Sequence, residues 1–246
     1  MVFNSWYVFW GIVFVFVSAI LYFLQINIFH STRDTFFYLF QDLAFVPIQV
    51  MLVSFIINQL LERREKENFF KKLNMVISVF FSEIGYELLK KYKVLDADFE
   101  KNKQNFLIQS EWKDNDYKNA IKNLSKIRFS FVINQQNLES LKQFLLDKRT
   151  IMLRLLENEN LLEHEDFSDM LLAISHLTEE LEFRKSFQNL YENDKSHLAK
   201  DIERFFYALL KEYFLYMMHL KNNYPYLFSL YVRVNPFTGK DTAEII

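Results

Sequence analysis

Two long apolar stretches dominate the beginning of the chain. The first, WYVFWGIVFVFVSAILYFL at residues 6–24, lies in a segment that has no charged residue before Arg33. The second, at about residues 36–58, carries Asp42 as its only charge. A helix needs about 20 apolar residues to cross the hydrocarbon core of a membrane. We therefore predict two transmembrane spans, at about residues 6–26 and 36–58, joined into a helical hairpin that occupies residues 1–60.

From residue 61 onward the pattern changes to apolar positions three and four residues apart, separated by charged ones, which is typical of amphipathic helices. Residues 61–93 contain no proline, and we predict that they form a helical stalk that continues from the second span. Residues 94–237 are predicted to form a bundle, and residues 238–246 a frayed tail. The strongest helical patterns in the bundle lie at residues 138–158, 165–183 and 195–221, and a short aromatic helix follows Pro225.

One segment of the bundle does not follow the helical pattern. RFSFVIN, at residues 128–134, alternates polar and apolar residues as a strand does, but no partner strand is evident. We predict an extended connector there, with Asn134 or Asn137 capping the helix that follows. The predicted fold class is thus all-α: a two-helix transmembrane hairpin that continues into a cytoplasmic multi-helix bundle.

Composition supports long helices and removes several classes of function. The 246 residues include three Gly, three Pro and no Cys, which excludes disulfides, thiolate metal sites and glycine-rich phosphate-binding loops. The net charge is −2, so a nucleic-acid-binding surface is not expected. No motif of a known catalytic class is present, and we predict a protein that is not an enzyme and needs no cofactor.

The distribution of basic residues predicts the topology. The end of the second span is followed by a basic group, whereas the turn between the spans carries only Arg33. Because basic residues favour the cytoplasmic side, residues 62–246 and the N-terminus are both predicted to lie in the cytoplasm of a prokaryotic cell, with the spans in its inner (plasma) membrane. The basic residues of this group are Arg63, Arg64, Lys66, Lys71 and Lys72.

Polar residues inside the spans form the first candidate site. Asp42 and Gln49 share one face of the second helix, and Ser18 and Tyr22 of the first helix fall at the depth of Asp42. We expect the two hydroxyls to donate hydrogen bonds to the carboxylate. The stripe is read either as contact between helices or as an ion or proton pathway. Pro47, near the middle of the same span, is expected to bend the helix.

A second candidate site lies in the turn between the spans, where His30, Arg33 and Asp34 could form an outer ligand pocket. A third consists of histidines and carboxylates in the last three helices. Their spacing is His-x-x-Glu rather than the Glu-x-x-His of di-metal bundles, so a metal site is the less favoured interpretation of this group. Its members are His164, His176, Glu179, His197, Asp201 and His219.

Three stretches carry a resemblance to known sequences. The segment from His30 through Glu83, which includes RDTFFYLFQDLAFVPIQVMLVSFIINQLLERREK, resembles uncharacterised two-pass membrane proteins of bacteria and archaea. LLEHEDFSDML with HLTEEL, and HLKNNYPYLFSLYVRVNPF, are similar to the same group. The resemblance implies a two-pass topology and supplies no activity and no catalytic residues.

These patterns favour a non-enzymatic membrane protein whose cytoplasmic bundle binds a partner or senses a signal. Its expected partners are the lipid bilayer, further copies of itself and a cytoplasmic protein. The first alternative is an oligomeric channel or transport accessory subunit with Asp42 and Gln49 along its pathway. The second alternative is a membrane-anchored metal-binding protein that uses the histidine and carboxylate group.

Overall fold

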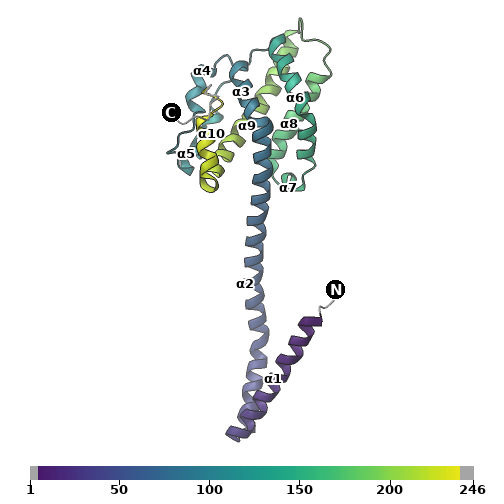
Figure 1. Ribbon diagram of the computed structural model, residues 1–246, viewed down its shortest axis with the longest axis vertical. Coiled ribbons are helices and arrows are strands. Elements are labelled where there is room, and N and C mark those ends of the chain that lie inside the picture. The colour runs from purple at the N-terminus through teal and green to yellow at the C-terminus, as the bar shows by residue number, and fades with distance from the viewer. Residues whose placement is uncertain (1–4, 239–246) are drawn as a thin grey trace. The chain divides into compact units, whose positions relative to one another are not determined.

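Helices make up nearly all the regular structure in the computed structural model, which describes residues 5–238 (Figure 1). The chain divides into two units, Met1–Glu67 and Asn68–Ile246, and helix α2 contributes to both. The prediction of an all-α fold is confirmed, and the predicted frayed tail lies almost wholly outside the described residues. In chain order the elements are α1 (Ser5–Phe29), α2 (Thr32–Phe80), the π-helical turn η1 (Phe81–Gly85), α3 (Tyr86–Leu95), α4 (Phe99–Asn102), the 3₁₀ turn η2 (Lys103–Asn105), α5 (Asp114–Leu124), α6 (Gln135–Leu156), α7 (Glu159–Leu162), α8 (Glu165–Glu182), α9 (Glu192–Asn223) and α10 (Pro225–Arg233).

The first unit consists of α1 and the first part of α2, and its apolar side chains are exposed. Phe14 is 68% exposed and Phe40 is 70% exposed, for example. By length and composition, α1 from Phe9 onward and α2 from Thr32 onward could each cross a membrane, with mean hydropathies of 2.3 and 1.9. No residue in the most apolar window of either helix is buried.

The second unit is built around α9, which contacts α3, α5, α8, α10 and η1 (Figure 1). The apolar stripe predicted for α9, from Leu198 to Leu220, is buried as expected. Phe206, Leu210 and Phe214 on its other sides are buried as well, because helices pack around it. Each such side chain contributes about 1.5–3 kcal/mol to folding. A helix that buries more than one face is a central element of the bundle.

The last turns of α2 enter the core of the bundle, where Leu73 and Ile77 are buried. At η1, which follows, one π-helical turn interrupts the α-helical spacing. Phe81 stacks on Tyr216 of α9 with ring centroids 4.6 Å apart, and Phe80 meets Phe167 of α8 at 5.2 Å. Gly85 is required at the end of the turn, because an added Cβ would lie 2.6 Å from Cδ1 of Phe81 and 2.9 Å from Cε1 of Phe80. The predicted helical stalk therefore continues into the bundle through a turn that the sequence pattern did not indicate.

The segment at residues 128–134 is the extended connector that the sequence predicts. Phe131 forms an isolated antiparallel bridge with Asp96, which follows α3. The buried Asp96 carboxylate accepts hydrogen bonds from the backbone N–H of Ser130 and Asp98 and from the Tyr92 hydroxyl. The Asn134 side chain then accepts a hydrogen bond from the backbone N–H of Asn137 and caps α6, as predicted.

Candidate functional site

The polar residues of the first unit lie on one face of α2. Asp42 and Gln49 are seven residues apart, about 10 Å along the helix, and both are exposed. Within the part of the chain that the structure describes, neither side chain forms a hydrogen bond or an ion pair. The hydrogen bonds expected from Ser18 and Tyr22 to Asp42 are therefore not formed. Helix α2 passes through Pro47 as one helix.

The turn between α1 and α2 is organised by helix capping. His30 has a φ of 49°, a left-handed conformation that commonly ends a helix, and its N–H donates to the Ile26 carbonyl oxygen. Ser31 Oγ donates a hydrogen bond of 2.5 Å to Oδ2 of Asp34, which lies in the first turn of α2, where a negative charge is favourable. Arg33 is exposed. The conformations of His30 and Asp34 are thus explained by the end of one helix and the start of the next.

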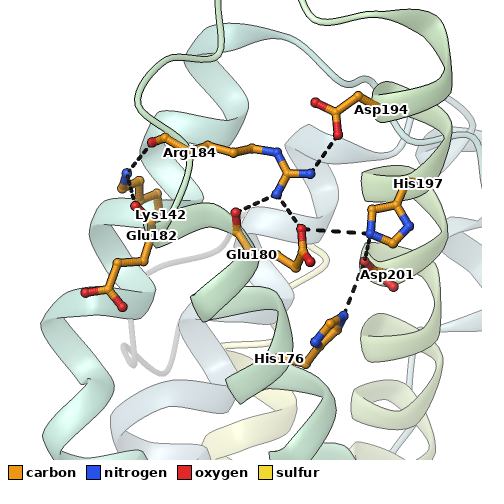
Figure 2. A network of polar contacts seen from close by, with 8 residues as sticks. All are labelled: Lys142, His176, Glu180, Glu182, Arg184, Asp194, His197 and Asp201. Carbon is orange, nitrogen blue, oxygen red and sulfur yellow. Dashed lines mark hydrogen bonds and ion pairs between the residues drawn. The ribbon is translucent and has the colours of Figure 1, made fainter.

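A separate polar group, in the second unit, joins α8 to α9, and we call it the α8–α9 network (Figure 2). Arg184, just beyond the end of α8, donates to the Glu180 carboxylate one turn earlier and, through Nη2, to Oδ1 of Asp194 at 2.7 Å. The Arg184 guanidinium holds the pKa of both carboxyls below their ordinary values, and they raise the pKa of Arg184. Lys142 of α6 donates to the backbone oxygens of Glu182 and Arg184 and so caps α8.

A buried aspartate extends this network along α9. Asp201 has 4% of its side chain exposed, and its Oδ2 lies 3.2 Å from Nε2 of His197 and 3.7 Å from Nε2 of His176. Nε2 of His197 is also 3.8 Å from Oε2 of Glu180. None of these contacts satisfies Oδ2, which is buried without a hydrogen-bond partner. The histidines, about half exposed, thus cover a carboxylate oxygen between α8 and α9 (Figure 2).

The structure brings together only three of the six residues predicted as a metal group, namely His176, His197 and Asp201. His164 caps α8, because its Nδ1 accepts a hydrogen bond from the backbone N–H of Phe167. His219 lies near the other end of α9, where burial lowers its pKa. Glu179 is exposed, and the neighbouring Glu180 takes the place near His197. Among residues 5–238, no group of three or more His, Asp and Glu is arranged to hold a metal ion.

Sequence reasoning did not find Arg184 or Asp194, and it considered Glu180 only as an alternative to Glu179 one turn from His176. The i, i+4 spacing of Glu180 and Arg184 was a readable signal for one ion pair. The ion-pair partner of Asp194 could not be predicted from the sequence, because the contact with Arg184 depends on how the connection between α8 and α9 folds.

Glu212 of α9 is a further buried carboxyl that the sequence did not single out. It is 2% exposed, and its Oε1 has no hydrogen-bond partner. Burial, together with the nearby Asp166 of α8, raises the pKa of Glu212 to about 7. Lys211 opposes this effect but is itself paired with Asp166, its Nζ lying 2.8 Å from Oδ2. The bundle therefore contains an acid that changes charge near neutral pH.

Comparison with known proteins accounts for nearly the whole chain. A family model described as the N-terminal helical domain of MJ1433 matches residues 2–61. A second, described as the C-terminal helical domain of the uncharacterised protein MJ1433, matches residues 69–233. The uncharacterised protein MJ1433 of Methanocaldococcus jannaschii is 41% identical over 226 residues, which cover 92% of this chain and 91% of that protein. No solved structure matches the chain.

Proposed function

The chain belongs to the family of the uncharacterised protein MJ1433, and from that premise we propose that it is a membrane-anchored, non-enzymatic protein with a partner-binding or sensory helical bundle. In this proposal α1 and the first part of α2 form a two-pass anchor. The bundle of the second unit lies in the cytoplasm, and the protein acts as a homo-oligomer.

The proposed membrane anchor is supported by the exposure of apolar side chains on all sides of α1 and the first part of α2. In a water-soluble protein such helices would bury one face or more, whereas here the most apolar window of each has no buried residue. An apolar surface of this extent is stable only against another apolar medium. A bilayer matches the length of both helices.

The cytoplasmic side is favoured by the charges that follow the second span. Arg63, Arg64 and Lys66 are exposed on α2, and Lys71 and Lys72 follow within two turns. The turn between the helices has Arg33 as its only basic residue. The positive-inside rule then assigns the bundle and both termini to the cytoplasm.

Partner binding is supported by two aromatic side chains beside the α8–α9 network. Phe183 and Tyr191 are 83% and 86% exposed, and they flank the connection that Arg184 holds to Asp194. Exposed aromatic residues on a fixed backbone are typical of protein contact surfaces, where they supply area at low entropic cost.

The anchor and its orientation can be tested together, because the chain has no Cys and a single introduced one is unique. After expression in a bacterial host, membranes are washed with alkaline carbonate, and Ser31→Cys and Ser82→Cys variants are treated with a membrane-impermeant maleimide in intact cells. We expect the protein to stay in the membranes, with label on the Ser31→Cys variant alone. Extraction of the protein by carbonate would refute the proposed anchor. Label on the Ser82→Cys variant alone would show that the orientation is the opposite of the one proposed.

A second candidate function is an ion pathway, which the unpaired state of Asp42 and Gln49 in the single chain favours. Reconstitution of the wild type and of Asp42→Asn into liposomes, followed by measurement of proton and cation flux, separates the two. Flux through the wild type that is lost in Asp42→Asn supports an ion pathway. Flux that is equal in both proteins and no higher than in empty liposomes refutes it.

A further inference from the structure

The polar stripe of α2 is incomplete in a single chain. Asp42 and Gln49 share a face with Tyr38 and Phe45, and on this face the exposed carboxyl and amide have no partner among the described residues. The opposite face is mainly apolar and includes Phe40 and Met51, which are 70% and 63% exposed.

This asymmetry matters in a bilayer. Lipid tails cannot hydrogen-bond, so a carboxyl or amide inside the hydrocarbon core is placed against another polar group or in a watery space. Within the described chain the first helix supplies no such group to Asp42, because neither the Ser18 nor the Tyr22 hydroxyl bonds to it. An apolar face can meet lipid without cost, but the face of Asp42 and Gln49 requires a cover from outside the chain.

We propose that this cover is the same face of α2 in a second copy of the chain, a step that rests on the membrane anchor proposed above. Copies inserted in one membrane share an orientation, so a twofold axis along the membrane normal brings Asp42 beside Asp42 and Gln49 beside Gln49 at equal depths. A primary amide both donates and accepts hydrogen bonds, so two Gln49 side chains can bond each other across the axis. The Asp42 side chains lie on the same face, and this arrangement removes them from the lipid tails together.

The geometry also gives the residues that meet along the axis. Phe45 and Ile56 lie on the same face of α2 as Asp42 and Gln49, at three- and four-residue steps. Met51 lies nine residues beyond Asp42, which is half a turn away in projection, and Phe40 is on that opposite side too. Side chains of the first pair lie near their counterparts in the dimer, and those of the second pair do not.

Cysteine cross-linking tests this arrangement directly. Single-Cys variants at Phe45 and Ile56, and matched controls at Phe40 and Met51, are oxidised in native membranes, and the products are separated by mass. We expect disulfide-linked dimers from Phe45→Cys and Ile56→Cys at least tenfold more than from the two controls. Equal yields from both faces, or no dimer from either, would overturn the proposal, and a product of any other mass would mean that a different protein covers the face.

A second measurement depends on the polar groups themselves. Förster transfer between labelled copies in liposomes, at increasing dilution in lipid, gives the strength of association. We expect the double variant Asp42→Leu/Gln49→Leu to weaken association about tenfold or more, whereas Ser54→Leu, which removes a polar group from another face, leaves it unchanged. Unchanged association in the double variant refutes the stripe as the interface. A chain that carbonate extracts from the membrane refutes the anchor instead, so the two failures are distinguishable.

Discussion

Replacement of Glu212 by Gln should change how the stability of the bundle depends on pH. Glu212 is buried in α9 with an unpaired oxygen, and burial, with the nearby Asp166, raises its pKa from the ordinary 4.5 to about 7. Glutamine has almost the same shape but no charge. The substitution therefore removes the ionisation and leaves the packing nearly intact.

The magnitude and the sign follow from linkage between proton binding and folding. A rise from 4.5 to about 7 corresponds to about 3 kcal/mol, at about 1.4 kcal/mol for each pKa unit. Below about pH 4.5 the group is protonated in both states and has no effect. Between about pH 4.5 and 7 the unfolded chain loses the proton first, so the free energy of unfolding falls as pH rises. Above about pH 7 the group is ionised in both states, and the free energy of unfolding falls no further on its account.

The assay is denaturant unfolding of the full chain in mild detergent at several pH values between 5 and 9. Trp112 reports on the bundle, since its ring lies 5.1 Å from that of Tyr117 and 6.0 Å from that of Phe214. Replacing Trp6 and Trp10 by Phe makes it the only tryptophan. Glu212→Gln should gain about 3 kcal/mol relative to the parent between pH 5 and pH 9.

The control is Glu203→Gln, which removes an exposed carboxylate from the same helix. The difference in stability between this variant and the parent should be small at every pH, because the Glu203 side chain is exposed and no charge is buried there when the chain folds. The reasoning is refuted if Glu212→Gln and the parent give parallel profiles across this range. Such a result would show that Glu212 is hydrated in the folded protein.

Three further predictions use the same unfolding assay. Gly85→Ala should destabilise the bundle by about 1–3 kcal/mol because the new methyl group overlaps the rings of Phe80 and Phe81; unchanged stability would show that the turn relaxes freely. Asn134→Ala should cost about 1 kcal/mol by removing the cap of α6, and Asn134→Asp should restore it; equal stability of both variants would contradict the capping role. Arg184→Met should cost about 1–2 kcal/mol at pH 7. That difference should shrink below about pH 4, because the lowered pKa values of Glu180 and Asp194 give stability that is lost as these carboxylates take up protons; a difference that stays constant with pH would refute the ion pairs.

Helical periodicity alone predicted the main elements of the bundle. The stripes at residues 138–158, 165–183 and 195–221 correspond to α6, α8 and α9, and the cap at Asn134 was found because an Asn before an apolar run is a local signal. The π-turn was missed for a physical reason. Ile77, Phe80, Ile84 and Leu88 follow one another at gaps of three and four residues across it, so the extra residue leaves the apolar pattern unchanged.

The candidate sites were predictable only as far as their contacts are local. His197 and Asp201 lie one turn apart on one helix, so their proximity could be read from spacing. The approach of His176 to Asp201 depends on how α8 packs against α9, and no residue pattern fixes that register. The burial of Glu212 escaped notice for the same reason, since a glutamate in a charged helix usually faces water.

The π-turn at Phe81–Gly85 also has a consequence for the length of the chain. A π-turn holds one residue more than α-helical spacing needs, and Ser82 within it is exposed. Deleting Ser82 would return the segment to continuous α-helix, and the aromatic rings before and after it would stay on the same faces of the helix. A deletion within α2 would instead rotate everything on one side of it by about 100°. Among relatives of this chain, a difference of one residue in the length of this long helix is therefore expected at the turn and nowhere else along it.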